Sequence, residues 1–407
     1  MKKCRVCKSK DLKLFLSLGR TPLANSFLEE DQLKLPEEFY PLNVCFCESC
    51  GFVQLAEVVP AEKMFKNYIY VTSTSEEARN HYKLLVEDAM NKFKLPENSL
   101  VVEFASNDGT LLKNFGKFNV RVLGVEPAEN IAPIAEAAGI ETINDFFNRK
   151  VAKNIVDSKG KASMIIGTNV FAHIDNLDEI MKSFQILLDD EGVIIIESPY
   201  LVDFFEKTEY DTIYHEHVSY LSLIPLVKFF GMYGFKIFDV KRTKIHGGSI
   251  KIFASGINSK FKETKNLSEL LLLEKKLGLD SIKPYLDFAL NVQKSRVKLL
   301  ELLYKLKLEG KKIIGYGAAA KGNTLLNYCN IGTDILDYIV DKNPLKQGKY
   351  TPGTNIPVVR PDRILKDHPD YMLILAWNFA DEIMKEQHKF KERGEKFIIP
   401  IPEAKII

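Results

Sequence analysis

Two closely spaced pairs of cysteines near the N-terminus constrain the fold of this 407-residue chain more than any other feature. Cys4 and Cys7 form one Cys-x-x-Cys pair, and Cys47 and Cys50 form the other. Each pair can present two thiolates to one tetrahedral metal ion, and four protein ligands leave no open position for water or substrate. The spacing therefore predicts a small N-terminal domain tied together by a structural zinc ion.

A further cysteine, Cys45, lies close to the second pair and could take the place of Cys47 as a ligand. We prefer Cys47 because it has the two-residue spacing to Cys50, and because Gly51 follows and allows a tight turn. Free buried cysteines are the alternative interpretation. In a reducing compartment, this clustering favours a metal site over disulfides.

Charge and hydropathy narrow the class of protein. Lys and Arg number 56 against 54 Asp and Glu, a net charge of +2, so we expect no broad positive surface of the kind that nucleic-acid-binding proteins carry. The basic N-terminus is not followed by the apolar segment of a secretion signal. No apolar run approaches the roughly 20 residues that cross a bilayer. We therefore expect a cytoplasmic enzyme that binds neither nucleic acid nor a membrane.

From residue 99 onward, short apolar runs alternate with helical patterns, which is typical of α/β folds. The run 100–104 predicts a strand that leads into a turn of small and polar residues and then into a helix. The run 120–125 predicts a second strand, which ends at the acidic Glu126. α/β folds bind adenosine-type cofactors at such a turn, and a carboxylate after the second strand suits the ribose hydroxyls.

The turn at 103–109 reads Glu-Phe-Ala-Ser-Asn-Asp-Gly and lacks the three glycines that cradle a pyrophosphate. S-adenosylmethionine (SAM) carries no phosphate and needs no such cradle. Asn144 and Phe146 could flank its adenine or be merely structural. Asn169 and His173 follow a further predicted strand, at the edge where open α/β sheets bind ligands. The candidate cofactor-binding residues are Glu103, Ala105, Asn107, Asp108, Gly109, Glu126, Pro127, Asn144, Phe146 and Asn169.

Residues 210–220 gather imidazole, carboxylate and phenol side chains more densely than any other part of the chain. No helical or strand periodicity explains this gathering, and histidine is the side chain whose ordinary pKa lies nearest neutral pH. We interpret the stretch as the reacting centre, the alternative being that His and Tyr fill polar corners of a core. Tyr68 and Tyr70, upstream, alternate as on a strand face and could wall a polar ligand or simply pack.

The C-terminal part begins with a leucine-rich helical pattern over 262–307, in which Leu286, Leu290, Val297, Leu300 and Leu303 are expected to pack. A strand at 312–316 and a Gly-x-Gly-x-x-Ala turn follow, and a second strand at 335–341 ends at Asp341. This arrangement is also a dinucleotide fingerprint, so NAD binding is a rival interpretation. Lys321 suits an anionic phosphate, and the diphosphate of a sugar nucleotide would serve as well as that of NAD.

Taken together, these motifs resemble the SAM-dependent C-methyltransferases of nucleotide-linked 4-keto-deoxysugars, in order and over essentially the whole chain. The chain departs from the family at Phe104-Ala105, where an aliphatic residue and glycine are more usual, and at Cys45. The motifs that carry the resemblance are the cysteine pairs, Asn107-Asp108-Gly109, Asn169-Val170-Phe171-Ala172-His173, Tyr214-His215-Glu216-His217, His246-Gly247-Gly248-Ser249 and Gly315-Tyr316-Gly317-Ala318.

The resemblance implies an α/β protein with three parts. They are a zinc-binding domain at 1–75, a class I SAM methyltransferase (Rossmann-like) domain at 76–258, and a helical connector with a second Rossmann-like domain at 259–407. A nucleotide-linked 4-keto sugar would be held between the latter two and methylated at C3, in the synthesis of deoxysugars for surface polysaccharides or natural products. We expect a monomer or a weak dimer.

The proposed chemistry needs a base and a group that stabilises an enolate, because a proton beside a ketone is only weakly acidic. We assign His217 as the base, Glu216 as its orienting or substrate-binding partner, and Tyr214 as donor to the enolate. Tyr68 and His173 would complete the pocket. The candidate substrate-binding residues are Tyr70, Ser73, His215, His246, Gly247, Tyr316, Lys321, Asn323 and Asp341. His215 could also face away, since neighbours on an extended strand point to opposite sides.

Three rival functions remain on the sequence alone. An O- or N-methyltransferase would use the same SAM fold without an enolate site. An NAD-dependent oxidoreductase would use the turn at Gly315. A zinc-ribbon nucleic-acid binder is the non-enzyme alternative, and the near-neutral charge disfavours it.

Overall fold

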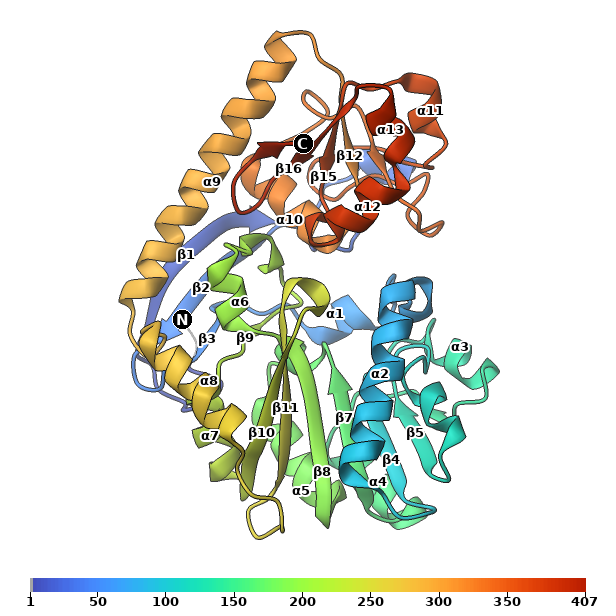
Figure 1. Ribbon diagram of the computed structural model, residues 1–407, viewed down its shortest axis with the longest axis vertical. Coiled ribbons are helices and arrows are strands. Elements are labelled where there is room, and N and C mark those ends of the chain that lie inside the picture. Colours follow the sequence, from blue (N-terminus) through green and yellow to red (C-terminus); the bar gives the residue numbers. More distant parts are fainter. Residues whose placement is uncertain (1–2) are drawn as a thin grey trace.

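The computed structural model describes residues 3–407, apart from the side chain of His246. The chain forms an N-terminal sheet domain, a middle lobe and a C-terminal lobe (Figure 1). The long helix α9 (Lys283–Leu308) runs along one side of the molecule, from the middle lobe to the C-terminal lobe.

The N-terminal domain is built on a four-stranded antiparallel sheet. Its elements are β1 (Leu12–Thr21), η1 (Glu30–Lys34), β2 (Tyr40–Cys47) and β3 (Val53–Leu55), followed by α1 (Ala61–Phe65) and η2 (Thr72–Thr74), and the sheet is completed by β9 (Ser219–Tyr220). The strand order is β1-β2-β3-β9, so the last strand comes from far along the chain, directly after the histidine-rich stretch. Gly51, at φ +80°, turns the chain between β2 and β3, and its N–H donates to the Cys47 carbonyl at 2.8 Å.

The middle lobe holds a seven-stranded sheet. Its elements are α2 (Glu76–Phe93), β4 (Leu100–Phe104), η3 (Leu112–Lys117), β5 (Arg121–Val125), α3 (Ala132–Ala137), β6 (Thr142–Ile143), α4 (Arg149–Lys159), β7 (Ala162–Thr168), η4 (Phe171–His173), α5 (Leu177–Leu187), β8 (Leu188–Pro199), α6 (Leu201–Glu206), η5 (Tyr210–Thr212), α7 (Leu223–Met232), β10 (Phe235–Thr243), η6 (Ile245–Gly247) and β11 (Ser249–Gly256). The order is β10-β11-β8-β7-β4-β5-β6, with β11 antiparallel to both its neighbours and the pairs from β8 to β6 parallel. The predicted class I methyltransferase fold is confirmed.

Helices cover both faces of this sheet, because successive side chains of a strand point to opposite faces. Val101 of β4 packs with Leu85 of α2 on one face. Val102 packs with Ile155 of α4 and Phe184 of α5 on the other. Helix α2 begins at Ser75, whose hydroxyl accepts the Ala78 N–H at 3.2 Å as an N-cap. The strands read as continuous apolar runs because both faces are buried.

The connector consists of α8 (Lys265–Lys276) and α9. The helix predicted over 262–307 is present in these two pieces. The expected packing is right for Leu303, which is buried, and for Leu300, which packs against the core, but wrong for Leu286, Leu290 and Val297, which are exposed. The buried stripe of α9 includes Tyr285, Phe288, Val292, Leu299 and Leu303.

The C-terminal lobe is a second Rossmann-like layer of strands and helices. Its elements are β12 (Ile313–Tyr316), α10 (Ala320–Cys329), β13 (Ile339–Val340), β14 (Val358–Val359), α11 (Arg363–Asp367), β15 (Tyr371–Ile374), η7 (Trp377–Phe379), α12 (Ala380–Glu386), α13 (His388–Glu392), β16 (Lys396–Ile399) and β17 (Lys405–Ile406). The six-stranded sheet has the order β14-β13-β12-β15-β16-β17, and only β17 is antiparallel to its neighbour. The second strand expected over 335–341 is confined to Ile339–Val340.

Two local expectations differ from the structure. Tyr68 and Tyr70 lie in a loop between α1 and η2, so the strand alternation assumed for them is wrong. Residues 213–218 form a turn between η5 and β9, so the extended strand assumed around His215 is wrong. Among residues 3–407, no helix is both long and apolar enough to cross a membrane.

Candidate active site and zinc site

The two cysteine pairs meet at the base of the N-terminal sheet. The Sγ atoms of Cys4, Cys7, Cys47 and Cys50 all lie within 4.8 Å of one another. Cys4 and Cys50 are 3.6 Å apart, and Cys7 and Cys47 are 3.5 Å apart. Zinc–sulfur bonds of about 2.3 Å in a tetrahedron place sulfurs ~3.8 Å apart, so the four thiols fit a structural zinc ion.

Cys45 is not a member of this group. It lies on β2, paired with Leu14 of β1 and Gln54 of β3, and it is fully buried in the core. Burial raises the pKa of its thiol to about 11. The four thiols that lie together thus include Cys47 and not Cys45, as the prediction of the ligand set requires.

The turn after β4 is held in an unusual backbone conformation. Ala105, Asn107 and Gly109 have φ values of +53°, +50° and +73°. Glu126, at the end of β5, anchors this turn by accepting the Asn107 N–H at 2.7 Å and the Ala128 N–H at 2.8 Å. Burial raises the pKa of Glu126. The carboxylate expected to bind a ribose thus also shapes the cofactor turn.

The loop before α2 is docked onto the same turn. Asn107 accepts the Thr72 N–H at 2.9 Å and donates to the Tyr70 carbonyl at 3.1 Å. Asp108 accepts the Ser73 N–H at 3.0 Å. Tyr70 and Ser73 therefore meet the candidate cofactor residues through their backbone groups.

Three buried side-chain oxygens in or beside this turn have no hydrogen-bond partner in the described part of the chain. They are Oε2 of Glu103, at the end of β4, Oγ of Ser106, within the turn, and Oδ1 of Asn169, just beyond β7. Burial raises the pKa of Glu103 well above its ordinary value. Unpaired buried acceptors suit a ligand that brings its own N–H donors, such as the ammonium group of SAM. The residues present therefore fit SAM.

The outer residues of this region are more open. The Asn144 side chain donates to the Glu126 carbonyl at 2.8 Å, and Pro127 and Phe146 are half-buried beside them. Phe104, one of the positions at which the chain departs from the family, is accommodated by Gly167. The Phe104 ring fills the space that a side chain at Gly167 would need.

The stretch predicted as the reacting centre folds into the turn that carries His217. Nδ1 of His217 lies 2.8 Å from the Thr212 carbonyl, and Nε2 lies 2.8 Å from the Tyr214 hydroxyl. A carbonyl can only accept, so we assign the proton to Nδ1 and the lone pair to Nε2. The orienting hydrogen bond expected from Glu216 thus comes from Thr212, a backbone contact that leaves no mark in the sequence.

His173, at the end of η4, stacks on His217 with ring centroids 5.0 Å apart. Its other face stacks on Phe65 of α1 at 5.6 Å and 5°. Burial lowers the pKa of His173 to about 4, so its imidazole is neutral at physiological pH. The structure therefore brings together two histidines that lie far apart in sequence.

Glu216 faces the N-terminal domain. Its carboxylate accepts the Tyr68 hydroxyl at 2.8 Å and the Asn25 side-chain amide at 2.6 Å. Burial raises the pKa of Glu216, while the two hydrogen bonds and Lys346 oppose that rise. Asn25 is a site residue that the sequence analysis did not single out, because a lone amide in a loop carries no spacing signal.

His215 points away from this cluster. Its ring packs edge-on against Tyr40 of β2 at 5.7 Å, and burial lowers its pKa. The turn, rather than strand alternation, sets this direction. The side chain of His246 lies outside the described residues, and the space beside Gly247 is filled by the Glu209 carboxylate.

The C-terminal lobe contributes an aromatic and charged wall. Lys321 lies 3.8 Å from Glu209 and 4.8 Å from the centroid of the Trp377 ring. The Trp377 indole donates to Asp211 at 2.6 Å. Burial raises the pKa of Glu209 to about 7, and Lys321 opposes this rise. The lysine expected to meet a phosphate therefore has acidic neighbours.

The other candidates in this lobe have separate roles. Asn323 donates to the Ala24 carbonyl at 2.7 Å and so ties α10 to the N-terminal domain. Tyr316 is buried in the core of the lobe. Asp341 accepts the Ala318 N–H at 2.6 Å and shapes its turn much as Glu126 does in the middle lobe.

Lys346 is a further residue missed from the sequence. It donates to the Ala318 carbonyl at 2.7 Å. Burial lowers the pKa of Lys346, while Asp341 and Glu216 oppose that fall. It is thus a cation near both the catalytic turn and the C-terminal lobe.

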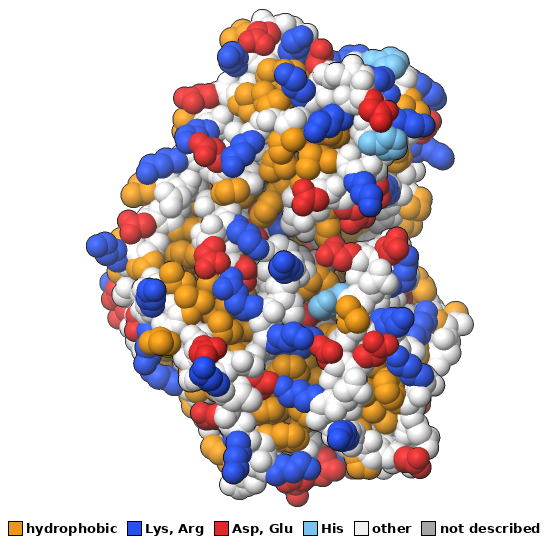
Figure 2. Space-filling view, viewed as in Figure 1, with side chains coloured by type: hydrophobic (Ala, Val, Ile, Leu, Met, Phe, Trp, Pro, Cys, Tyr) orange, Lys and Arg blue, Asp and Glu red, His pale blue; other side chains and the backbone are white. Residues whose placement is uncertain are grey.

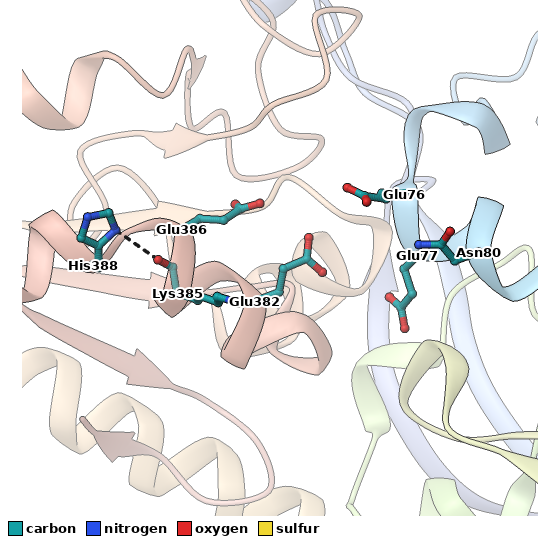
Figure 3. A pocket seen from close by; sticks show the side chains of 7 residues that line it. All are labelled: Glu76, Glu77, Asn80, Glu382, Lys385, Glu386 and His388. Atoms are coloured by element: carbon teal, nitrogen blue, oxygen red, sulfur yellow. Dashed lines mark hydrogen bonds between the residues drawn. The ribbon is translucent and has the colours of Figure 1, made fainter.

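Two hollows accompany these residues. A small cavity is lined by His217, Glu209, Tyr200 and Gly248, among others. A larger cleft of ≈ 620 Å³ opens between α2 and α12–α13, away from the histidine pair. Figure 3 shows Glu76 and Glu77 on its one wall facing Glu382 and Glu386 on the other. On the face seen in Figure 2, acidic side chains gather where the two lobes meet, among otherwise mixed charges.

Comparison with known proteins places these features in a family. A zinc binding domain matches residues 4–65, a methyltransferase domain matches 76–240, and a C-methyltransferase C-terminal domain matches 244–402. NovU, a C-methyltransferase of Streptomyces niveus, is 36% identical over 404 residues, which cover 99% of this chain and 96% of NovU.

Two solved structures are similar to part of the chain. Magnesium protoporphyrin IX methyltransferase of Synechocystis, with bound SAM, is 15% identical over 43% of this chain and 78% of its own, with a TM-score of 0.33. A SAM-dependent methyltransferase of Anabaena variabilis is 19% identical over 49% of this chain and 100% of its own, with a TM-score of 0.35.

The three matched domains follow one another along the chain, and the Streptomyces enzyme aligns with nearly all of it. This protein therefore belongs to the C-methyltransferase family.

Proposed function

We propose that this protein uses SAM to methylate C3 of a nucleotide-linked 4-keto-deoxysugar, after removing the proton from that carbon. The observation that supports this most is the hydrogen-bonded chain Thr212–His217–Tyr214 stacked on His173. A base joined to a hydroxyl donor is what the formation of an enolate requires.

His217 would act through Nε2. The Thr212 carbonyl holds the proton on Nδ1, so the Nε2 lone pair is available once a substrate takes the place of the Tyr214 hydroxyl. The C3–H bond breaks and the proton moves to Nε2. The electron pair of the broken bond forms the C3–C4 double bond. The negative charge then lies on the C4 oxygen, where the displaced Tyr214 hydroxyl can donate to it.

The neighbours keep these groups in the correct state. The neutral His173 stacks on His217 without adding a like charge beside the imidazolium that forms. Tyr68 and Asn25 fix the Glu216 carboxylate, which in our proposal accepts a hydrogen bond from a sugar hydroxyl.

SAM, when bound, supplies the methyl group that is transferred from sulfur to carbon. Glu103, Asn169 and the turn at 105–109 would hold it, on the evidence of the unpaired oxygens described above. Lys321 and Lys346 are cations of the C-terminal lobe near this region, and each suits a phosphate of a nucleotide sugar.

The NAD alternative has less support. The space that a side chain at Gly315 would fill is taken by Ile339, and that at Gly317 by Ala376. These glycines thus serve the packing of the lobe itself.

Exchange of the C3 proton with solvent, without SAM, tests the deprotonation step. The protein is incubated in D2O with an NDP-4-keto-deoxysugar, and proton NMR follows the C3 resonance. We expect deuterium to enter at C3, and not to enter with His217→Asn. His368→Asn is a matched control, because His368 is exposed and its φ of +45° suits asparagine. Methylation of a sugar oxygen without exchange at C3 would contradict the proposal.

A further inference from the structure

We propose that Arg5, within the first cysteine pair, is a positioning residue that couples the zinc-binding knuckle to both histidine segments of the active site. The knuckle is defined as residues 4–8. This inference rests on the proposed function, because it takes His173 and His217 as the reacting pair.

The guanidinium of Arg5 lies at the junction of two domains. Nε donates to the Asp175 carboxylate at 2.8 Å, and Nη1 donates to the Leu55 carbonyl at 3.0 Å. The Arg5 backbone N–H donates to the Gln54 side chain at 2.8 Å. The side chain is only 6% exposed, so the guanidinium is buried between its partners.

Each partner leads to one histidine. Asp175 lies two residues beyond His173, in the short segment between η4 and α5. Leu55 ends β3, and its N–H donates to the Val218 carbonyl at 2.9 Å. Val218 directly follows His217, and β3 continues the contact by pairing with β9.

The geometry explains why one side chain could hold both segments in register. A guanidinium presents its donors in a rigid plane, so neither contact can shift without weakening the other. A metal bound to Cys4 and Cys7 would fix the backbone on both sides of Arg5. The histidine rings stack at 5.0 Å, and misplacement of reacting groups by about 1 Å can cost ~100-fold in rate.

Substitution of Arg5 with a matched control tests this coupling. Arg5→Gln removes the charge and the fork. Lys8→Gln is the control, because it leaves the guanidinium contacts of Arg5 in place. Lys8 belongs to the same knuckle, donates to the backbone carbonyl of Arg5 at 2.6 Å and pairs with Asp178 of α5 at 2.7 Å, and the side chains of Lys8 and Asp178 are partly exposed, at 47% and 28%. We expect Arg5→Gln to retain zinc and the affinity for SAM while kcat falls by about 10- to 100-fold. Lys8→Gln should change kcat by less than about twofold.

A measurement without substrate separates this inference from the proposed function. The pKa of His173, held near 4 by burial, can be followed by NMR of the imidazole in each variant. We expect it to rise toward the ordinary 6.5 in Arg5→Gln and to stay unchanged in Lys8→Gln. If it rises although no carbon methylation can be found, the coupling stands and the proposed function fails. If it stays near 4 and kcat is unchanged, the coupling is wrong.

Two further variants guard against a folding defect. Arg5→Lys keeps the charge but not the fork, so it should restore stability without restoring kcat. Asp175→Asn changes a side chain that is 52% exposed and lies outside the knuckle. It should lower kcat by several-fold, and the double variant with Arg5→Gln should be no slower than Arg5→Gln alone, as for two members of one contact. Additive losses would overturn the proposal.

Discussion

At the scale of single residues, the chemistry depends on backbone groups as much as on side chains. The Thr212 carbonyl sets the tautomer of His217, and the backbone N–H groups of Asn107 and Ala128 hold Glu126. The carboxylates that the sequence suggested as partners of a ligand or a histidine also hold the structure together through hydrogen bonds. Residue types therefore indicated the candidate site, whereas the roles proposed for its residues depend on the contacts in the structure.

The role of His217 gives the sharpest prediction at this scale. His217→Asn removes the base but keeps a polar side chain, so kcat should fall by about 10²- to 10⁴-fold. The Kd for SAM, measured by calorimetry, should stay within about twofold. Retention of full activity would remove His217 from the mechanism.

Ala105 is a second test, because it occupies a left-handed conformation that costs a residue with Cβ about 1–2 kcal/mol. Ala105→Gly should raise the free energy of unfolding by ~0.5–1 kcal/mol, after the greater freedom of glycine in the unfolded chain is subtracted. Ala137→Gly, in the exposed end of α3, should instead destabilise by ~0.5–1 kcal/mol. Thermal unfolding of both variants checks the signs, and a loss in Ala105→Gly would contradict the account.

Glu209 makes stability depend on pH. Burial raises its pKa from 4.5 to about 7 in the folded protein. Between these values the unfolded chain releases the proton while the folded protein keeps it, so this group lowers stability as pH rises. Glu209→Gln has no carboxyl group to titrate. Its free energy of unfolding relative to that of the wild type should therefore rise by up to about 3 kcal/mol between pH 4.5 and pH 8.

Melting temperatures measured across this pH range check the prediction for Glu209. The exposed Glu97→Gln serves as the control and should show no such trend. A constant difference between Glu209→Gln and wild type at all pH values would mean that Glu209 titrates normally.

At the scale of elements, the sequence predicted what periodicity encodes and missed what tertiary contacts decide. The strands at Leu100–Phe104 and Ala162–Thr168 were found because buried parallel strands are continuous apolar runs. Helix α9 was predicted, but its buried face only in part, because both of its faces carry leucines. The pairing of β9 with β3 joins segments that lie far apart in the sequence, and no local sequence pattern predicts it.

The candidate site likewise contains residues that the sequence predicted and residues that it did not. The cysteine spacing identified all four thiols of the zinc group, since ligand spacing is a local signal. Asn25 and Lys346 reach the catalytic turn only through the fold and could not be recognised from sequence.

The zinc-binding element yields a paired prediction. Cys47→Ser removes one of four ligands, so zinc content should fall well below one per chain and the N-terminal sheet should lose stability. Cys45→Ser changes a neighbouring thiol outside the group and should keep its zinc. A chelator assay on the unfolded proteins measures the zinc content of both variants. Zinc loss in Cys45→Ser alone would reverse the ligand assignment.

At the scale of the whole molecule, the three parts converge on one catalytic turn. The N-terminal domain supplies Asn25 and the strand β3, which pairs with β9. The middle lobe supplies His173 and His217, and Trp377 of the C-terminal lobe donates to Asp211. The acidic cleft between α2 and α12 lies where the two lobes face each other (Figure 3).

The proposed methylation at C3 is tested most directly by incubating the protein with SAM and an NDP-4-keto-deoxysugar, and analysing the product by mass spectrometry and proton NMR. We expect a product heavier by one methylene, with the new methyl group on C3. A methyl group on an oxygen, or reduction of the ketone without methylation, would contradict it.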